Sequence, residues 1–348
     1  MSGFAGARQV AETFLAGVRN LIIATKEREK MESTPQNSNT QNAQPKPSRL
    51  WRILRLTPIS LMLLILGVLL IMFILGGMTK ITAWYLSQII PPVFGLVSLI
   101  AVIIYAIVKR KFNRLMAVTL IVAIVSLSPA ISLVKPLPFP ASLEKTKPAA
   151  TVRLPANVSL IVAWGGDAQK TNYHVIAPDQ RWAYDLVVAP AAHGSDKLED
   201  YGCYGVPVVA PASGLIVKAH DGEPDAVPGV VSNNFTAPTG NHVVIKLDET
   251  GTYLVIAHLK PGSVAVKTGD TVAEGQVIGA CGNSGNTSEP HIHIHHQRQD
   301  PNVYPLNFAE GLPLYFRDHD GPPMPTGGYE LDGETVIFTG DTVQHIGE

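Results

Sequence analysis

Three long runs of apolar residues constrain this chain more than any other feature of its sequence. The runs cover residues 56–78, 84–108 and 115–134, and none of them contains an acidic or basic side chain. A helix of about 20 apolar residues is long enough to cross the roughly 30 Å hydrocarbon core of a bilayer. One such run also suits a buried helix of a soluble protein, but three in close succession predict three transmembrane helices.

Charge is distributed unevenly about these runs and indicates their orientation. The net charge of the 348 residues is only -1, yet residues 1–149 carry a net +12 and residues 150–348 a net -13. Basic residues cluster before the first run and again at 109–114. Between the first two runs, in contrast, Lys80 is the one basic residue. Basic loops stay on the cytoplasmic side. We therefore expect a multi-pass membrane protein with a cytoplasmic N-terminus and an extracytoplasmic region after Lys135.

The same charge pattern bears on partners. It predicts contact with a lipid bilayer and no nucleic-acid partner, because the basic residues mark topology and do not form a general basic face. A second reading is that the helices transport or sense a solute and the outer domain is accessory. The lack of charged residues within the runs argues against it, since intramembrane pathways usually contain one.

The flanking segments divide the chain further. Residues 1–55 are expected to be cytoplasmic, with an amphipathic helix over 4–22 and a polar linker over 33–48. That helix suits a membrane surface, a regulatory membrane partner or plain cytoplasmic exposure. Residues 135–155 are rich in proline and predict a second linker. Residues 318–348 form a polar tail, in which 335–339 predicts a strand.

Residues 156–317 have the pattern of an exported β domain. Short β-branched runs at 158–163, 182–188, 214–218, 242–247, 253–258 and 276–280 are separated by Gly, Pro, Asn and Asp. This spacing, with few helical stretches, predicts a mainly antiparallel β domain. Its two cysteines, Cys203 and Cys281, suit either a disulfide in an oxidising compartment or two buried thiols.

The sequence Glu289-Pro-His-Ile-His-Ile-His-His296 is the clearest chemical signal in this domain. Alternate side chains of a strand share a face, so His291 and His293 point into one site and Ile292 and Ile294 point the other way. His295 falls on the same face, farther along. Two imidazoles in this arrangement can serve one metal site, but an isolated His-x-His is a weak signal.

Several further motifs occur in a fixed order around that strand. They are Asn172-Tyr-His174, Tyr184-Asp185, Ile256-Ala-His258 and Cys281-Gly-Asn-Ser-Gly-Asn286, followed by Ser288-Glu-Pro-His-Ile-His293. Together they resemble the lysostaphin-type zinc metallopeptidases, a family of bacterial cell-wall endopeptidases. The resemblance covers about residues 158–316 and implies a mainly antiparallel β catalytic domain of the lysostaphin type, here preceded by three α-helical transmembrane segments.

The resemblance also implies a site. His174, Asp185 and His293 match the family's zinc ligands, with one Zn²⁺ per chain, and His258 and His291 match its two catalytic histidines. The 11-residue interval from His174 to Asp185 is longer than the commonest family pattern, which makes His174 the least certain ligand. Three protein ligands leave a coordination position for water, as in catalytic zinc sites. The sequence does not divide the roles of general base and oxyanion stabiliser between His258 and His291.

The predicted function is therefore that of a membrane-anchored zinc metalloendopeptidase that hydrolyses peptide bonds outside the cytoplasm by zinc-activated water. Peptidoglycan is the expected substrate, and a peptide in a secreted or surface protein is the alternative. A different class of function stays open as well. The domain could be a non-catalytic zinc- or wall-binding module that recruits or activates another hydrolase.

Overall fold

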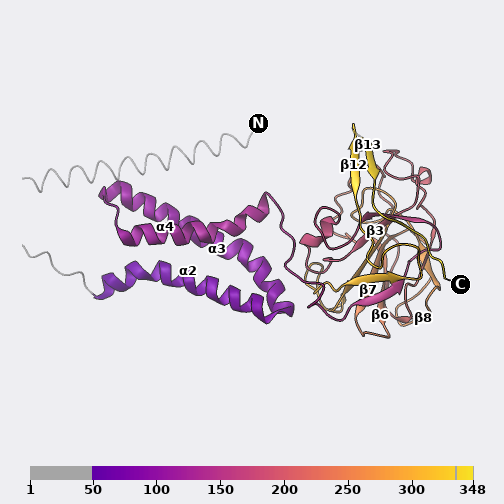
Figure 1. Ribbon diagram of the computed structural model, residues 1–348, viewed down its shortest axis with the longest axis horizontal. Helices are drawn as coiled ribbons and strands as arrows, with labels where there is room; N and C mark the ends of the chain where they lie inside the picture. Colours follow the sequence, from indigo (N-terminus) through magenta and orange to yellow (C-terminus); the bar gives the residue numbers. More distant parts are fainter. Residues whose placement is uncertain (1–48, 334, 348) are drawn as a thin grey trace, which may run out of the picture. The chain divides into compact units, whose positions relative to one another are not determined.

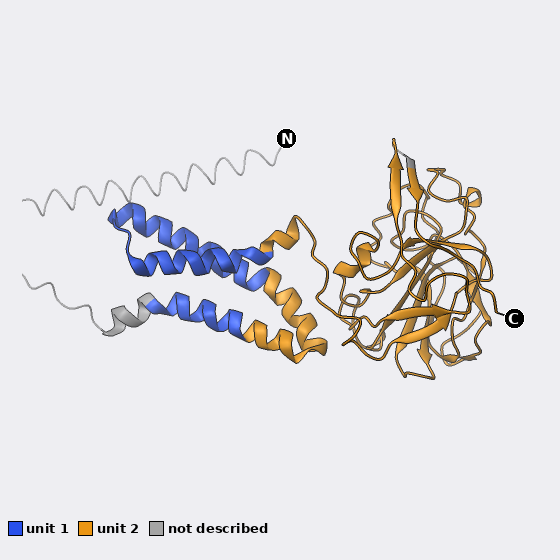
Figure 2. Ribbon diagram, viewed as in Figure 1, with its two compact units in different colours: residues 1–67, 89–129 blue, residues 68–88, 130–348 orange. Residues whose placement is uncertain are grey.

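The computed structural model describes residues 49–333 and 335–347 (Figure 1). The amphipathic helix and the polar linker expected within residues 1–48 lie outside this part of the chain. The chain divides into two compact units, which comprise residues 1–67 with 89–129 and residues 68–88 with 130–348 (Figure 2). Each unit is described separately below.

Three apolar helices occupy the region of the three apolar runs. Helix α2 spans Arg49–Leu75, α3 spans Gly77–Lys109, and α4 spans Arg114–Leu127 and continues into the 3₁₀ segment η1, Ser128–Leu133. Gly76 and Gly77 have φ values of 76° and 55°, a conformation that favours glycine, and they separate α2 from α3. Asn113 caps α4 by accepting a hydrogen bond from the Met116 N–H. All three segments are long and apolar enough to cross a membrane.

Small and polar residues lie where the helices of the first unit meet. The Met62 side chain of α2 is 2% exposed, and its sulfur accepts hydrogen bonds from Ser98 of α3 and Ser126 of α4. A Cβ atom at Gly95 would lie only 2.7 Å from the carbonyl oxygen of Ala123. Glycine at this position therefore permits the close approach of α3 and α4, as small residues do in membrane helix pairs.

The second unit contains a mainly antiparallel β domain. Its largest sheet has eight strands in the order β14-β2-β3-β10-β7-β6-β5-β8, and every pairing in it is antiparallel. The strands are β2 (Leu160–Trp164), β3 (Tyr184–Val187), β5 (Gly214–His220), β6 (Asn241–Leu247), β7 (Tyr253–Leu259), β8 (Thr271–Val272), β10 (Ile292–Gln297) and β14 (Thr342–Val343). Three apolar helices followed by such a domain confirm the predicted fold class.

Three strand pairs complete the domain. Strand β4 (Pro207–Val209) pairs with β9 (Val277–Ala280), and β12 (Tyr329–Asp332) pairs with β13 (Thr335–Phe338), both antiparallel. Strand β1 (Ala150–Arg153) pairs in parallel with β11 (Leu314–Arg317). Residues 150–153 lie inside the segment expected to be a linker. They form a strand because no proline lies between Pro148 and Pro155, and because Ala150 and Val152 pack into the core at 2% exposure each.

The core lies against one face of the large sheet. On β10, Ile292 and Ile294 are fully buried among the core residues, which agrees with the predicted alternation. The opposite face of β10 therefore carries His293, His295 and Gln297. The polar site described below lies on this face of the sheet.

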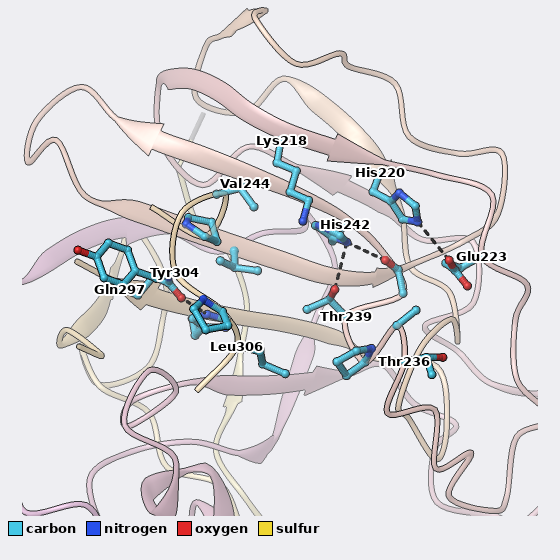
Figure 3. A pocket seen from close by; sticks show the side chains of 17 residues that line it. Lys218, His220, Glu223, Thr236, Thr239, His242, Val244, Gln297, Tyr304 and Leu306 are labelled. Atoms are coloured by element: carbon cyan, nitrogen blue, oxygen red, sulfur yellow. Dashed lines mark hydrogen bonds and ion pairs between the residues drawn. The ribbon is translucent and has the colours of Figure 1, made fainter. Parts of the chain in front are cut away.

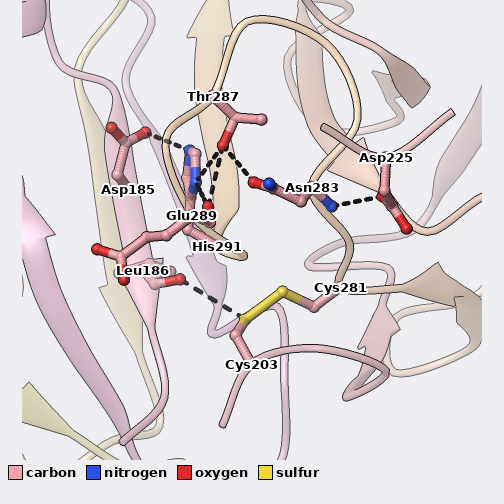
Figure 4. Close-up of a disulfide and its surroundings, with 9 residues drawn as sticks. All are labelled: Asp185, Leu186, Cys203, Asp225, Cys281, Asn283, Thr287, Glu289 and His291. Atoms are coloured by element: carbon pink, nitrogen blue, oxygen red, sulfur yellow. Dashed lines mark hydrogen bonds and ion pairs between the residues drawn. A yellow bond between two sulfur atoms is a disulfide. The ribbon is translucent and has the colours of Figure 1, made fainter. Parts of the chain in front are cut away.

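A disulfide joins Cys203 to Cys281 (Figure 4). Both cysteines are buried, and the Cys281 residue begins the loop that leads to His291. The structure therefore decides between the two alternatives that the sequence left open. The bond fixes the base of a loop whose residues contact the site described next.

Candidate metal centre

Three of the predicted side chains meet at one point in the domain. Potential ligand atoms of His174, Asp185 and His293 all lie within 4.8 Å of one another. The Nε2 atom of His174 lies 2.9 Å from one Asp185 carboxylate oxygen, and Nδ1 of His293 lies 2.8 Å from the other. All three residues are 5% exposed, so the cluster is buried but not sealed.

His174 lies on a short 3₁₀ helix, η2 (Tyr173–Ile176), whose position depends on Asn172. The Asn172 side chain is fully buried and accepts a hydrogen bond from the His174 N–H. Its amide group also donates to the carbonyl oxygens of Gly166 and Ala183, at 2.9 and 3.1 Å. Because Ala183 directly precedes β3, the Asn172 side chain links the two ends of the segment between His174 and Asp185.

Sheet register positions the other two residues. In the antiparallel pair of β3 and β10, Asp185 lies directly opposite His293. Opposite residues of neighbouring strands place their side chains on the same face at close range. The sequence predicted the face of His293 from alternation, but this pairing joins residues 108 positions apart and is visible only in the fold.

The electrostatics of the cluster favour an ionised Asp185. Burial alone raises the pKa of this carboxyl, but the neighbouring His174 and His291 and the hydrogen bonds from His174 and His293 outweigh it. The pKa is therefore held well below its ordinary value. Burial lowers the pKa of His293, which favours the neutral imidazole that a metal ligand requires.

His258 and His291 lie beside this cluster and face each other. Their ring centroids are 4.6 Å apart, and the His258 ring is 5.7 Å from that of His293. The Nε2 atom of His291 lies 3.6 Å from Asp185 (Figure 4). The structure thus brings all five predicted residues together, and none lies elsewhere in the domain.

Backbone carbonyl groups fix the tautomers of this pair. Nδ1 of His258 lies 2.7 Å from the Ser284 carbonyl oxygen, and Nδ1 of His291 lies 2.7 Å from the Glu289 carbonyl oxygen. A carbonyl oxygen only accepts, so each Nδ1 carries the proton and each neutral ring keeps a basic Nε2. Burial, followed by the neighbouring His291 and His293, lowers the pKa of His258 well below its ordinary value, so this ring is neutral near pH 7.

His258 also has a strained backbone. Its φ of 63° lies in the left-handed region, which costs a non-glycine residue about 1–3 kcal/mol. Strain of this kind persists where the surrounding structure holds it, here through the bond from the His258 N–H to the Thr239 carbonyl oxygen. Such outliers cluster at functional sites, and this one aims the ring at His291.

The strand that carries His293 continues as a row of hydrogen-bonded side chains. Nε2 of His293 lies 2.9 Å from Nδ1 of His295, whose Nε2 lies 3.1 Å from the amide oxygen of Gln297. Alternation had placed His295 on this face but assigned it no contact with His293. The row supports the His293 ring from the side opposite Asp185.

Two histidines without a predicted role, His220 and His242, form a separate group on β5 and β6. Their rings are 5.4 Å apart, and His220 lies 3.3 Å from the Glu223 carboxylate. Both line a cavity of about 370 Å³ together with Lys218 and Tyr304, and their side chains are drawn in Figure 3. Burial lowers the pKa of His242 to about 4, so it is neutral near pH 7.

The donor set of the cluster suits a divalent metal of the zinc type. Two imidazole nitrogens and one carboxylate oxygen are ligands that zinc prefers, and three protein ligands are typical of catalytic sites. The rigid support of each ligand by Asn172, by the β3–β10 register and by His295 matches the hydrogen-bonded surroundings that metal sites need. The residues present therefore fit the implied Zn²⁺.

Comparison with known proteins agrees with this chemistry. Residues 199–305 match the model of peptidase family M23. Members of this family are generally zinc metallopeptidases that act on peptidoglycan, although some are inactive. The match includes His258, His291 and His293, whereas His174 and Asp185 precede it. It confirms the predicted resemblance of the β domain to the lysostaphin-type peptidases.

Three solved structures are similar to part of this chain. The catalytic domain of the prophage-encoded M23 protein EnpA from Enterococcus faecalis is 20% identical, with 38% of this chain and 73% of that chain covered and a TM-score of 0.26. The catalytic domain of lysostaphin from Staphylococcus simulans is 25% identical, with 35% and 75% covered and a TM-score of 0.24. A zinc-containing peptidase from Vibrio cholerae is 21% identical, with 33% and 26% covered and a TM-score of 0.22.

Proposed function

We propose that this protein is a zinc metalloendopeptidase held at the outer face of a membrane by its three helices, because residues 199–305 match the model of peptidase family M23. The proposed substrate is the peptide part of peptidoglycan. The observation that carries the proposal is the convergence of a His174, Asp185 and His293 ligand set with two further histidines of fixed tautomer.

The proposed division of labour follows from the contacts of each residue. His174, Asp185 and His293 hold the metal. When bound, zinc makes a water molecule more acidic and polarises the scissile carbonyl group. His258 and His291 act next to the metal, each through a basic Nε2 whose ring is anchored by its Nδ1–H. One accepts the proton of the attacking water, and the other stabilises the developing oxyanion or protonates the leaving amine.

The membrane arrangement is part of the proposal. The three helices cross the bilayer with the N-terminus in the cytoplasm, and the β domain lies outside. The distribution of basic residues and the disulfide both support this orientation, since disulfides persist in oxidising compartments. Reporter fusions before α2 and after the β domain test it, and a β domain located in the cytoplasm would refute it.

Activity is tested with the full chain purified in detergent micelles. The protein should release soluble fragments from peptidoglycan, lose that activity when the metal is chelated, and regain it when zinc is restored. His291→Ala should abolish hydrolysis without loss of zinc, and His319→Ala, in the tail, is the matched histidine control. Zinc-loaded protein that cleaves neither peptidoglycan from several wall types nor a peptide library would refute the peptidase proposal. If the His291→Ala chain keeps the cellular phenotype, the domain acts by binding alone.

A further inference from the structure

The hairpin of β12 and β13 has two chemically different faces. It lies in the C-terminal tail, beyond the residues that match the peptidase family. Tyr329 pairs with Phe338, and Leu331 pairs with Val336. Alternation along each strand places these four apolar side chains on one face. Glu330 and its partner Ile337 lie on the other face.

The apolar face of the hairpin borders a cavity of about 610 Å³. All four of its side chains line this cavity, and neither Glu330 nor Ile337 does. A smaller cavity of about 320 Å³ is lined by Asp185 and His291. The two cavities share Trp164, Ser288, Glu289 and Phe338 as lining residues. The cavity beside the hairpin, called the groove below, is therefore adjacent to the cavity that borders the metal cluster.

Aromatic rings connect the hairpin to the cluster. The Trp164 ring contacts Tyr329 on one side and Tyr173 on the other, at centroid distances of 5.2 and 5.1 Å. Tyr173 in turn donates a hydrogen bond to the Asp185 carboxylate and packs on His174. The hairpin is therefore linked to the cluster through the rings of Trp164 and Tyr173.

The charge of the groove is negative at its polar end. Glu289 is the single carboxylate among the twelve residues that line the larger cavity, and none of the twelve is lysine or arginine. One Glu289 oxygen accepts a hydrogen bond from the Ala192 N–H. Burial raises the pKa of the nearby Tyr201, and the carboxylates of Glu289, Asp200 and Asp196 raise it further. Apolar walls, aromatic faces and one carboxylate together favour a cation on an apolar stem.

We propose that this groove is a substrate subsite for a residue with a primary ammonium group on an apolar stem, such as lysine or another diamino acid. The stem packs on Trp164 and the hairpin face of Tyr329, Leu331 and Phe338, and the ammonium group pairs with Glu289. This assignment rests on the proposed peptidase function and specifies the substrate class of that site.

Binding to the metal-depleted full chain in micelles tests the subsite without turnover. The probe is a fluorescein-labelled pentapeptide of glycines with a central lysine, and the comparison peptide carries acetyl-lysine at the same place. Fluorescence anisotropy should show about tenfold tighter binding of the lysine peptide, which corresponds to about 1.4 kcal/mol. Glu289→Gln should remove this preference.

A matched pair of charge variants tests the hairpin itself. Leu331 and Ile337 are 64% and 47% exposed, so lysine at either position leaves the core intact. Leu331→Lys places a positive charge in the groove and should weaken binding of the lysine peptide about tenfold, whereas Ile337→Lys should bind like the wild type. Phe338→Ala should weaken binding of both peptides, with the thermal midpoint as a check on folding.

The outcomes separate this subsite from the proposed activity. Equal binding by Leu331→Lys, Ile337→Lys and wild type, or an unchanged lysine preference in Glu289→Gln, overturns the subsite even when the zinc-loaded chain hydrolyses peptides. Selective binding of the lysine peptide without any hydrolysis by the zinc-loaded chain keeps the subsite and refutes the peptidase.

Discussion

The Asn172 side chain holds His174, one of the candidate metal ligands, in place. Its side chain makes three hydrogen bonds, to the His174 N–H and to the carbonyl oxygens of Gly166 and Ala183. Asn172→Ala removes all three inside a fully buried site. At a net value of about 1 kcal/mol for each bond, the β domain should lose about 3 kcal/mol of stability. For a domain of this size the thermal midpoint should fall by about 10 °C.

The same substitution should weaken zinc binding. Without its cap, η2 no longer fixes the direction of His174 toward Asp185, and loss of such a supporting contact costs about 10- to 100-fold in metal affinity. Competition with a chromophoric chelator measures this affinity on the full chain, below the new thermal midpoint. Lys170→Ala, an exposed substitution in the same loop, is the matched control.

One result would refute this reasoning. If folded Asn172→Ala protein binds zinc as tightly as the wild type, the cap does not position a ligand. His174→Ala measured in parallel then separates two explanations. Unchanged affinity there too would mean that His174 is not a ligand, which is the least certain assignment made from the sequence.

Three further predictions concern other parts of the domain. His295→Ala removes the contact to His293 Nε2 and should lower zinc affinity about tenfold in the same competition assay, with little change if the row has no positioning role. The pKa of His242 is about 4 in the fold and about 6.5 in the unfolded chain, so the unfolded state takes up a proton first as the pH falls. Stability should therefore drop by about 3 kcal/mol between pH 6.5 and pH 4, and unfolding curves of His242→Gln should show a smaller loss over this range. Reduction of the Cys203–Cys281 disulfide, which closes a loop of 78 residues, should cost about 4 kcal/mol, and an unchanged midpoint in reductant would contradict this.

Local pattern accounts for what the sequence predicted correctly. Alternation on β10 separated Ile292 and Ile294 from the histidines because a strand has a strict period of two. The apolar runs predicted α2, α3 and α4 for the same kind of reason. Their ends differ by a few residues where glycine, as at Gly76, terminates a helix that composition alone would continue.

The features that the sequence did not predict depend on contacts between segments that are far apart in the chain. The opposition of Asp185 and His293 depends on a pairing between strands far apart in the chain. The left-handed backbone of His258 depends on the loop at Thr239. Strand β1 forms in a proline-rich stretch because β11 offers it an edge. The metal-binding and catalytic roles of the five site residues stay predictions until the metal and the activity are measured.

The Cys203–Cys281 disulfide closes a loop that lies inside the longer segment between His174 and His293. The segment from His174 to His293 spans about 119 residues, and the disulfide shortcut of 78 residues lies wholly inside it. An oxidised but unfolded chain therefore has an effective path of only about 40 residues between these two ligands. Logarithmic loop-closure entropy then lowers the cost of their meeting by about 1 kcal/mol, or roughly fivefold in encounter probability. Formation of the disulfide before His174 and His293 meet is thus the favoured order of assembly for the β domain.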